Sequence, residues 1–166
     1  MNTIAKYLLF GFLILTFSCG KADKNIKPII INTILNPKLE ADFRKMDLKT
    51  IYPKLLTPEN YDAERDTVLT KKILTFQKNL VDGMNSEKIN WNVNESEISI
   101  FTRIYFDSIG RIEYFAFKIN NDDVKLKAVE EFKNLLEKNI KDKSLGIERN
   151  TKYNYCVNFE LPVEKE

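Results

Sequence analysis

Residues 97–120 read EISIFTRIYFDSIGRIEYFAFKIN, and this stretch decides the fold. Two runs rich in β-branched and aromatic residues, 97–106 and 111–120, are typical of β-strands. Between them lie Asp107, Ser108, Ile109 and Gly110. Glycine readily adopts the positive φ that a short hairpin connection requires, and aspartate bonds to the backbone of its own turn. The stretch therefore predicts a β-hairpin.

A helix is predicted directly after the hairpin. Asn121, Asp122 and Asp123 offer an N-cap and acidic residues for the first turn. Over residues 124–140 the apolar residues recur at helical spacing and share one face. They are Val124, Ala128, Phe132, Leu135, Leu136 and Ile140. We expect the helix to end before Gly146.

The stretch TKYNYCVNFELP, residues 151–162, predicts a last, half-buried strand. Its apolar residues alternate strictly with Lys152, Asn154, Cys156, Asn158 and Glu160. A crossover helix brings the third strand back parallel to the second, so the sheet is wholly antiparallel only if the third strand lies beside the first. We therefore predict an α+β domain with a three-stranded antiparallel sheet and the first strand in its middle.

Both faces of this sheet are apolar and need a cover. In the first strand one face carries Ile98, Ile100, Ile104 and Phe106, and the other face carries Phe101 and Tyr105. In the second strand one face carries Ile112, Tyr114 and Ala116, and the other face carries Phe115, Phe117 and Ile119. We assign the helix over 124–140 to one face. A second helix, over 59–81, is assigned with Trp91 to the other face.

The helix over 59–81 is predicted from a Thr57-Pro58 start and from apolar residues at helical spacing. These are Leu69, Ile73, Phe76 and Leu80, and Asp82-Gly83 is expected to end the helix. The preceding residues 28–56 give mixed signals. PIIINTIL is consistent with a short strand, and Asn36 followed by Pro37 with the start of a short helix.

The N-terminus, MNTIAKYLLFGFLILTFSCGKADK, carries one lysine, a short apolar run and a cysteine at residue 19. A membrane-spanning helix needs about 20 apolar residues, so this run indicates a signal segment. It resembles the bacterial lipoprotein signal, which implies that residues 1–18 are removed and that Cys19 becomes the lipid-modified first residue. The alternatives are an ordinary cleaved signal or an uncleaved anchor.

We therefore expect a protein of the cell envelope, held by a lipid on Cys19 to a membrane that faces the periplasm or the cell surface. Residues 19–27 would be a polar tether, in which eight extended residues reach at most ~28 Å. Residues 28–166 would form a single domain. If Cys19 is acylated, Cys156 is a lone thiol that is either packed or exposed, and no internal disulfide is expected.

The charge balance and the residue types bear on the class of function. The 26 basic and 24 acidic residues nearly cancel, which gives no reason to expect nucleic acid as a partner. The sequence has no histidine, the commonest general base and metal ligand. We predict a non-enzyme with no cofactor and no metal, although a hydrolase built from distant carboxylates stays open. The acidic pairs Asp122-Asp123 and Glu130-Glu131 are interpreted as solvated charges.

Residues 97–162 resemble the C-terminal domain of the TonB energy transducers. The resemblance rests on Phe106-Asp107 and Gly110-Arg111-Ile112 of the hairpin, on Ala128 of the helix, and on YCVNFELP around Phe159. In that family the last strand lies at the sheet edge and docks an extended peptide of an outer-membrane transporter. The resemblance implies a partner-strand edge here at Asn154, Tyr155, Cys156, Val157 and Asn158.

The chain also differs from the transducers, which have a transmembrane helix and a long proline-rich span. It has five prolines and a short expected tether, so we predict no energy-transducing role. Tyr52-Pro53 is the candidate for the Tyr-Pro pair of that family. The predicted function is protein–protein interaction with an envelope protein or peptide.

The alternative function is binding of an apolar ligand on the sheet face, or a structural place in an envelope assembly. The candidates for the lining of such a ligand site are five aromatic residues of the strands: Phe101, Tyr105, Tyr114, Phe115 and Phe117. Aromatic side chains in strands more often form core. Burial separates the two interpretations, because a helix over 59–81 that closed the second face would leave no ligand site.

Overall fold

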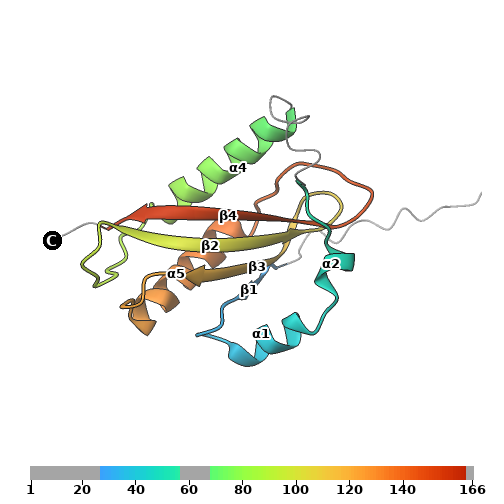
Figure 1. Ribbon diagram of the computed structural model, residues 1–166. Coiled ribbons are helices and arrows are strands. Elements are labelled where there is room, and N and C mark those ends of the chain that lie inside the picture. The colour runs from blue at the N-terminus through green and yellow to red at the C-terminus, as the bar shows by residue number, and fades with distance from the viewer. Residues whose placement is uncertain (1–26, 57–67, 164–166) are drawn as a thin grey trace, which may run out of the picture.

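The computed structural model describes residues 27–56 and 68–163 (Figure 1). The predicted signal segment, Cys19, the tether up to residue 26, and residues 59–67 of the predicted helix lie outside these ranges. The elements are β1 (Ile29–Ile31), α1 (Pro37–Arg44), α2 (Leu48–Ile51), α4 (Val68–Met84), β2 (Glu97–Phe106), β3 (Ile112–Ile119), α5 (Leu126–Ile140) and β4 (Tyr153–Pro162). The predicted α+β class is confirmed.

The sheet has four strands in the order β1-β3-β2-β4. Strands β2 and β3 form the predicted antiparallel hairpin, and β4 lies antiparallel beside β2, which places β2 between them as expected. The predicted three-stranded antiparallel sheet is nevertheless wrong in detail, because β1 adds to β3 in parallel and makes the sheet mixed. The strand lies within PIIINTIL, where a short strand was considered, but no local pattern indicates which strand it joins across so long a connection.

The hairpin turn forms as the sequence predicts. Gly110 has a φ of 87°, and Asp107 Oδ1 accepts hydrogen bonds from the backbone N–H groups of Ile109 (3.0 Å) and Arg111 (2.8 Å). The other carboxylate oxygen of Asp107 accepts from Arg111 Nε at 2.7 Å. A Cβ on Gly110 would lie 3.0 Å from the backbone nitrogen of Ile147, so the turn needs glycine both for its φ and for its space.

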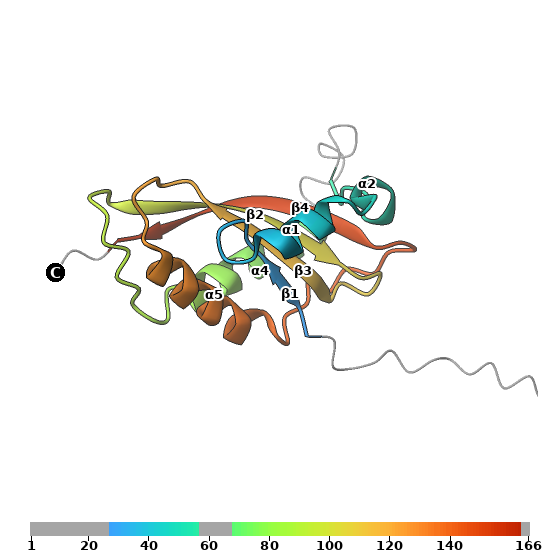
Figure 2. The same cartoon turned by 90° about the horizontal axis from the view of Figure 1, so that it is seen from below.

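Helices α4 and α5 pack side by side on one face of the sheet (Figures 1 and 2). The assignment of the helix over 59–81 to the opposite face is therefore wrong. The apolar stripe of α4 joins the same core cluster as Ile98, Ile100 and Phe132. We call this cluster the first core, and the face of the sheet that it covers the first face. Trp91 belongs to this cluster as well, with its ring centroid 5.7 Å from that of Phe132.

The packing of the two helices gives Gly83 a role inside α4. Asp82-Gly83 does not close the helix, which continues to Met84. Gly83 lies where α5 approaches, and its carbonyl accepts a hydrogen bond from Asn139 Nδ2 at 3.0 Å. A Cβ on Gly83 would meet Asn139 Oδ1 at 2.5 Å. The glycine is thus a contact position between helices and not a terminator.

The start of α5 also differs from the prediction. The helix begins at Leu126 with Lys125 as its N-cap, and no side chain caps it. Asn121 serves the hairpin instead, since its Oδ1 accepts from the N–H of Ser99 (2.9 Å) and its Nδ2 donates to the carbonyl of Glu97 (3.2 Å). The amide therefore extends the β2–β3 ladder where a cap was expected.

The second face of the sheet is covered in part by α1 and α2. Its core cluster contains Ile31, Phe43, Tyr52 and Tyr105, with Leu48, Tyr114 and Ala116 packed against it. A register shift between Tyr105 and Phe106 pairs Phe106 with Ile112, so that Glu113 is the extra residue of a β-bulge. The bulge turns Ile112 into the first core with Phe115 and Phe117, and the predicted grouping of Ile112 with Tyr114 is wrong.

Candidate functional site

The outer edge of β4 is the predicted partner-strand edge, and the structure defines which of its groups point outward. The N–H of Asn154 donates to the carbonyl of Pro53, and the carbonyl of Asn154 accepts from the N–H of Leu55, both at 2.9 Å. The pairing of β4 with β2 runs without a shift from Glu97↔Pro162 to Phe106↔Tyr153. Because an antiparallel ladder alternates, Cys156 and Asn158 present their backbone groups to the same outer side as Asn154.

The five predicted edge residues therefore divide into three kinds. Asn154 is already paired with the Pro53–Leu55 segment of its own chain. Tyr155 and Val157 direct their backbone groups at β2, and the Tyr155 hydroxyl accepts from Gln77 Nε2 of α4 at 2.9 Å. Cys156 and Asn158 form no backbone hydrogen bond on the outer side with any residue that the structure describes. Glu160, which the prediction omitted, shares their outward orientation by the same alternation.

A hollow of about 390 Å³ follows this edge and separates it from α4. We call it the edge groove. Leu74 and Val81 supply its apolar part on the helix side, and Leu74 is 58% exposed. Lys78 and Asp82 form an ion pair of 2.6 Å there. The strand side is residues 157–160. The edge groove thus combines an apolar wall with backbone groups that no described residue pairs.

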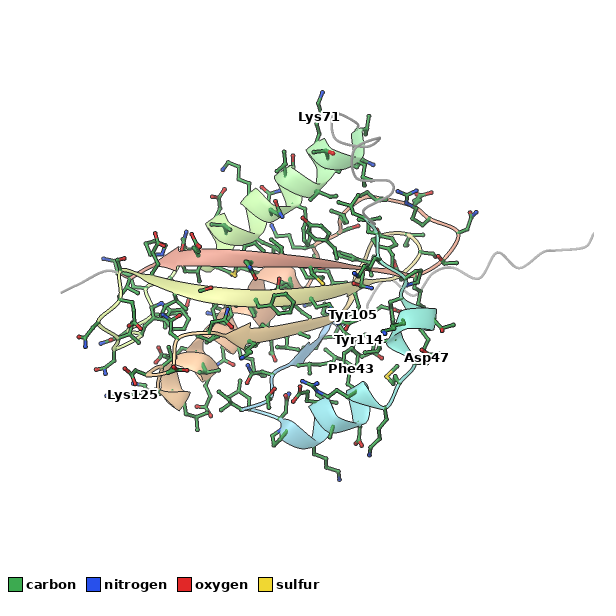
Figure 3. The ribbon with its side chains drawn as sticks, in the orientation of Figure 1. Phe43, Asp47, Lys71, Tyr105, Tyr114 and Lys125 are labelled. Atoms are coloured by element: carbon green, nitrogen blue, oxygen red, sulfur yellow. The ribbon has the colours of Figure 1, made fainter. Side chains whose placement is uncertain are left out.

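A second hollow, of about 350 Å³, lies between α1 and the second face of the sheet. We call it the face hollow. Its aromatic lining is Phe43, Phe101, Tyr105 and Phe117, and Phe101 is 37% exposed. Tyr105 and Phe43 meet edge to face with their ring centroids 5.1 Å apart, as Figure 3 shows beside Tyr114. Phe43, Tyr105 and Tyr114 pack ring against ring as an aromatic cluster, and Phe43 and Tyr105 of this cluster line the hollow.

The charged lining of the face hollow is mostly basic: Arg44, Arg103, Lys118 and the single acid Glu40. Glu40 Oε1 accepts from Arg44 Nε at 2.6 Å. A hydrogen bond from Thr33, together with Arg44, lowers the pKa of the Glu40 carboxyl. Arg103 Nε instead donates to Cys156 Sγ at 3.1 Å, a contact that raises the pKa of the guanidinium. Among the described residues, neither Arg103 nor Lys118 pairs with a carboxylate.

A partly exposed network beside the hollow holds Tyr52 in place. The Tyr52 hydroxyl donates to Glu113 Oε2 at 2.7 Å, and Lys152 Nζ donates to Glu113 Oε1 at 2.8 Å. The Lys152 ammonium lies 5.6 Å from the centroid of the Tyr52 ring. Burial raises the pKa of the Tyr52 hydroxyl, so it stays protonated and acts as a hydrogen-bond donor. Tyr52-Pro53 therefore links the aromatic cluster to the β4 edge.

The five aromatic residues predicted as a ligand lining do not act together. Phe101 and Tyr105 line the face hollow, and Phe117 touches it from the first core. Tyr114 packs within the aromatic cluster, and Phe115 is fully buried in the first core. The basic side chains of the hollow were missed, because residues from β1, α1, β2 and β3 meet there only in the folded chain.

Residues 27–56 and 68–163 contain no group of three or more His, Cys, Asp or Glu side chains that could hold a metal ion. None of the helices in these residues has both the length and the apolar composition that a membrane span requires. Comparison of the chain with protein families, with curated proteins and with solved structures finds no match.

Proposed function

We propose that this protein is a lipid-anchored binding module of the cell envelope that captures an extended peptide by strand addition at the outer edge of β4. The observation that carries the proposal is the contact of Asn154 with the Pro53–Leu55 segment. That segment lies parallel to β4 as an isolated bridge and makes two backbone hydrogen bonds of 2.9 Å. The edge therefore already accepts one piece of extended chain.

A partner peptide would continue along β4 past this bridge. It would pair with the outward backbone groups of Cys156, Asn158 and Glu160, which alternate at the spacing of a strand. Every second side chain of the peptide would point into the edge groove against Leu74 and Val81. This geometry favours a peptide with apolar residues at alternate positions.

The membrane part of the proposal rests on the sequence. The lipoprotein-like segment supports acylation of Cys19, and the polar tether would keep the domain near the membrane that holds the lipid. The absence of histidine in the chain supports binding over catalysis.

The test is amide hydrogen exchange of the detergent-solubilised protein with a library-selected peptide that has alternating apolar residues. Strand addition should slow exchange at the amides of Cys156, Asn158 and Glu160 in the saturated complex. A matched pair of variants isolates the backbone. Asn158→Pro removes the outward N–H, whereas Asn158→Ala removes only the side chain. A net hydrogen bond contributes about 0.5–1.5 kcal/mol, so Asn158→Pro should weaken the peptide about 2- to 12-fold.

Asn158→Ala should bind within about twofold of the parent protein, because it keeps the same backbone donor. Unchanged exchange at all three amides in the saturated complex would refute strand addition at this edge.

A second candidate function is ligand binding on the second face of the sheet. It is favoured by the position of α4, which packs on the first face and leaves the face hollow lined by Phe101 and Tyr105. The volume of about 350 Å³ lies at the lower end for ligand pockets, which are about 300–1,000 Å³.

A further inference from the structure

The face hollow joins an aromatic wall to two basic side chains on neighbouring strands. In the sheet register Phe101 is directly opposite Lys118, and Arg103 is directly opposite Ala116. Arg103 and Lys118 are therefore diagonal neighbours, whose separation in a sheet is about 7–8 Å. The small Ala116 side chain leaves room in front of Arg103. One compact acidic group can lie between the two cations.

These two cations lack compensation within the hollow. The one acid in its lining, Glu40, is engaged by Arg44 and Thr33. Arg103 interacts with the Cys156 thiol and the Tyr105 hydroxyl, neither of which is a carboxylate, and Lys118 has no ion pair among the described residues. The two like charges on this diagonal repel each other, and a bound anion would relieve the repulsion. The charge of the site thus selects for an anion.

We propose that the face hollow binds a small amphipathic anion, with its carboxylate between Arg103 and Lys118 and its apolar part against Phe101 and Phe43. A volume of about 350 Å³ suits one aromatic ring system or a short acyl chain. This inference rests on the second candidate function and adds the chemical class of the ligand.

The test uses two fluorescent probes that share one skeleton. 8-Anilinonaphthalene-1-sulfonate carries an anionic group, and N-phenyl-1-naphthylamine is its neutral counterpart. Titration of the detergent-solubilised protein, with the fluorescence of each probe in the same detergent without protein subtracted, gives both affinities. We expect the anionic probe to bind at least about tenfold more tightly at low salt, with the difference shrinking at high salt.

Variants connect this difference to the two cations. Arg103→Gln and Lys118→Gln should each weaken the anionic probe about five- to tenfold and leave the neutral probe within about twofold. Lys141→Gln is the matched control, because Lys141 is an exposed lysine outside the hollow. It should change neither affinity. 3-Phenylpropionate should displace the anionic probe, and 3-phenylpropanamide should not.

Two failures are distinguishable. If both probes bind equally well and Arg103→Gln and Lys118→Gln change neither affinity, the anion preference is refuted while the hollow remains a ligand site. Ala116→Trp, which fills the hollow, tests the site itself. If that variant melts at the parent temperature and still binds both probes unchanged, the second candidate function is refuted with it.

Discussion

The register of β4 predicts that proline is tolerated at the outward-facing residues after Asn154 and not at the residues between them. Val157 pairs with Thr102, and the alternation seen at Asn154 directs the N–H of Val157 at β2. Its carbonyl faces the same way and accepts from Thr102 Oγ1 at 2.9 Å. The N–H of Asn158 points outward. Val157→Pro and Asn158→Pro are therefore a matched pair that differ by one position.

The magnitude follows from what each proline leaves unpaired. Val157→Pro removes the donor for the carbonyl of Thr102, a residue with no exposed surface. A buried carbonyl left without its partner costs about 1–3 kcal/mol, and the misfit of the ring adds to this. We expect a loss of at least about 2 kcal/mol in the free energy of unfolding. Asn158→Pro removes no backbone hydrogen bond within residues 27–56 and 68–163 and should cost less than about 1 kcal/mol.

Urea unfolding followed by the fluorescence of Trp91 measures both values. Trp91 is buried against Phe132, so its emission reports the unfolding of the first core. With a slope of about 2 kcal/mol per molar urea, Val157→Pro should lower the midpoint by at least about 1 M. Equal losses for the two variants, or a larger loss for Asn158→Pro, would refute the assigned edge geometry and the docking proposal with it.

Four further outcomes are expected. Cys19→Ala should abolish partitioning into a detergent phase without changing the melting temperature, and equal partitioning of both proteins would contradict lipidation. Cys156→Ser should change the urea-derived stability by less than about 1 kcal/mol, since serine can still accept from Arg103; a loss of several kcal/mol would contradict this. Gly110→Ala should cost at least about 1 kcal/mol in the same assay, because its φ is 87° and the added Cβ meets Ile147. The pKa of the Glu137 carboxyl is lowered, chiefly by its hydrogen bond from Lys133. The stability that ionised Glu137 contributes is therefore complete above the unfolded pKa of about 4.3, and it is lost as pH falls through the folded pKa. The stability of Glu137→Gln should thus fall less than that of the parent between about pH 5 and 3, and identical slopes would contradict the assignment.

Local patterns were sufficient for the elements of the second half. The turn Asp107–Gly110 contains its own hydrogen bonds, so its chemistry can be predicted before any tertiary contact is known. The alternation in 153–161 and the helical spacing in 124–140 likewise report which side of each element is buried. The order of β3, β2 and β4 followed from these elements, because a crossover helix permits an antiparallel third strand only beside the first.

The predicted helix cap at Asn121 and the predicted helix end at Gly83 were wrong because other parts of the fold contact these two residues. Asn121 carries the side chain of a good helix cap, but the open backbone groups of Ser99 and Glu97 lie within its reach and engage it. Glycine commonly ends a helix, but Gly83 lies inside α4, where α5 approaches it closely. Each residue had two physically reasonable roles, and only the neighbours present in the fold selected one.

The candidate sites show the same division. The sequence indicated a half-buried last strand, and the resemblance drew attention to residues 154–158 as an edge. Which of those residues present free backbone groups depended on register, a property of two strands together. The basic lining of the face hollow had no counterpart in the sequence analysis, because Arg103 and Lys118 become neighbours only through the pairing of β2 with β3.

What the sequence by itself determined is the set of elements in the second half and the class of the domain, because the period of apolar residues and the chemistry of turns act over a few neighbouring residues. The tertiary structure alone decided which face α4 covers, that β1 extends the sheet, and that a β-bulge turns Ile112 inward. An apolar stripe records that a helix must be buried, but it carries no information on which of two apolar faces will bury it. That choice depends on how all the elements share the available surface.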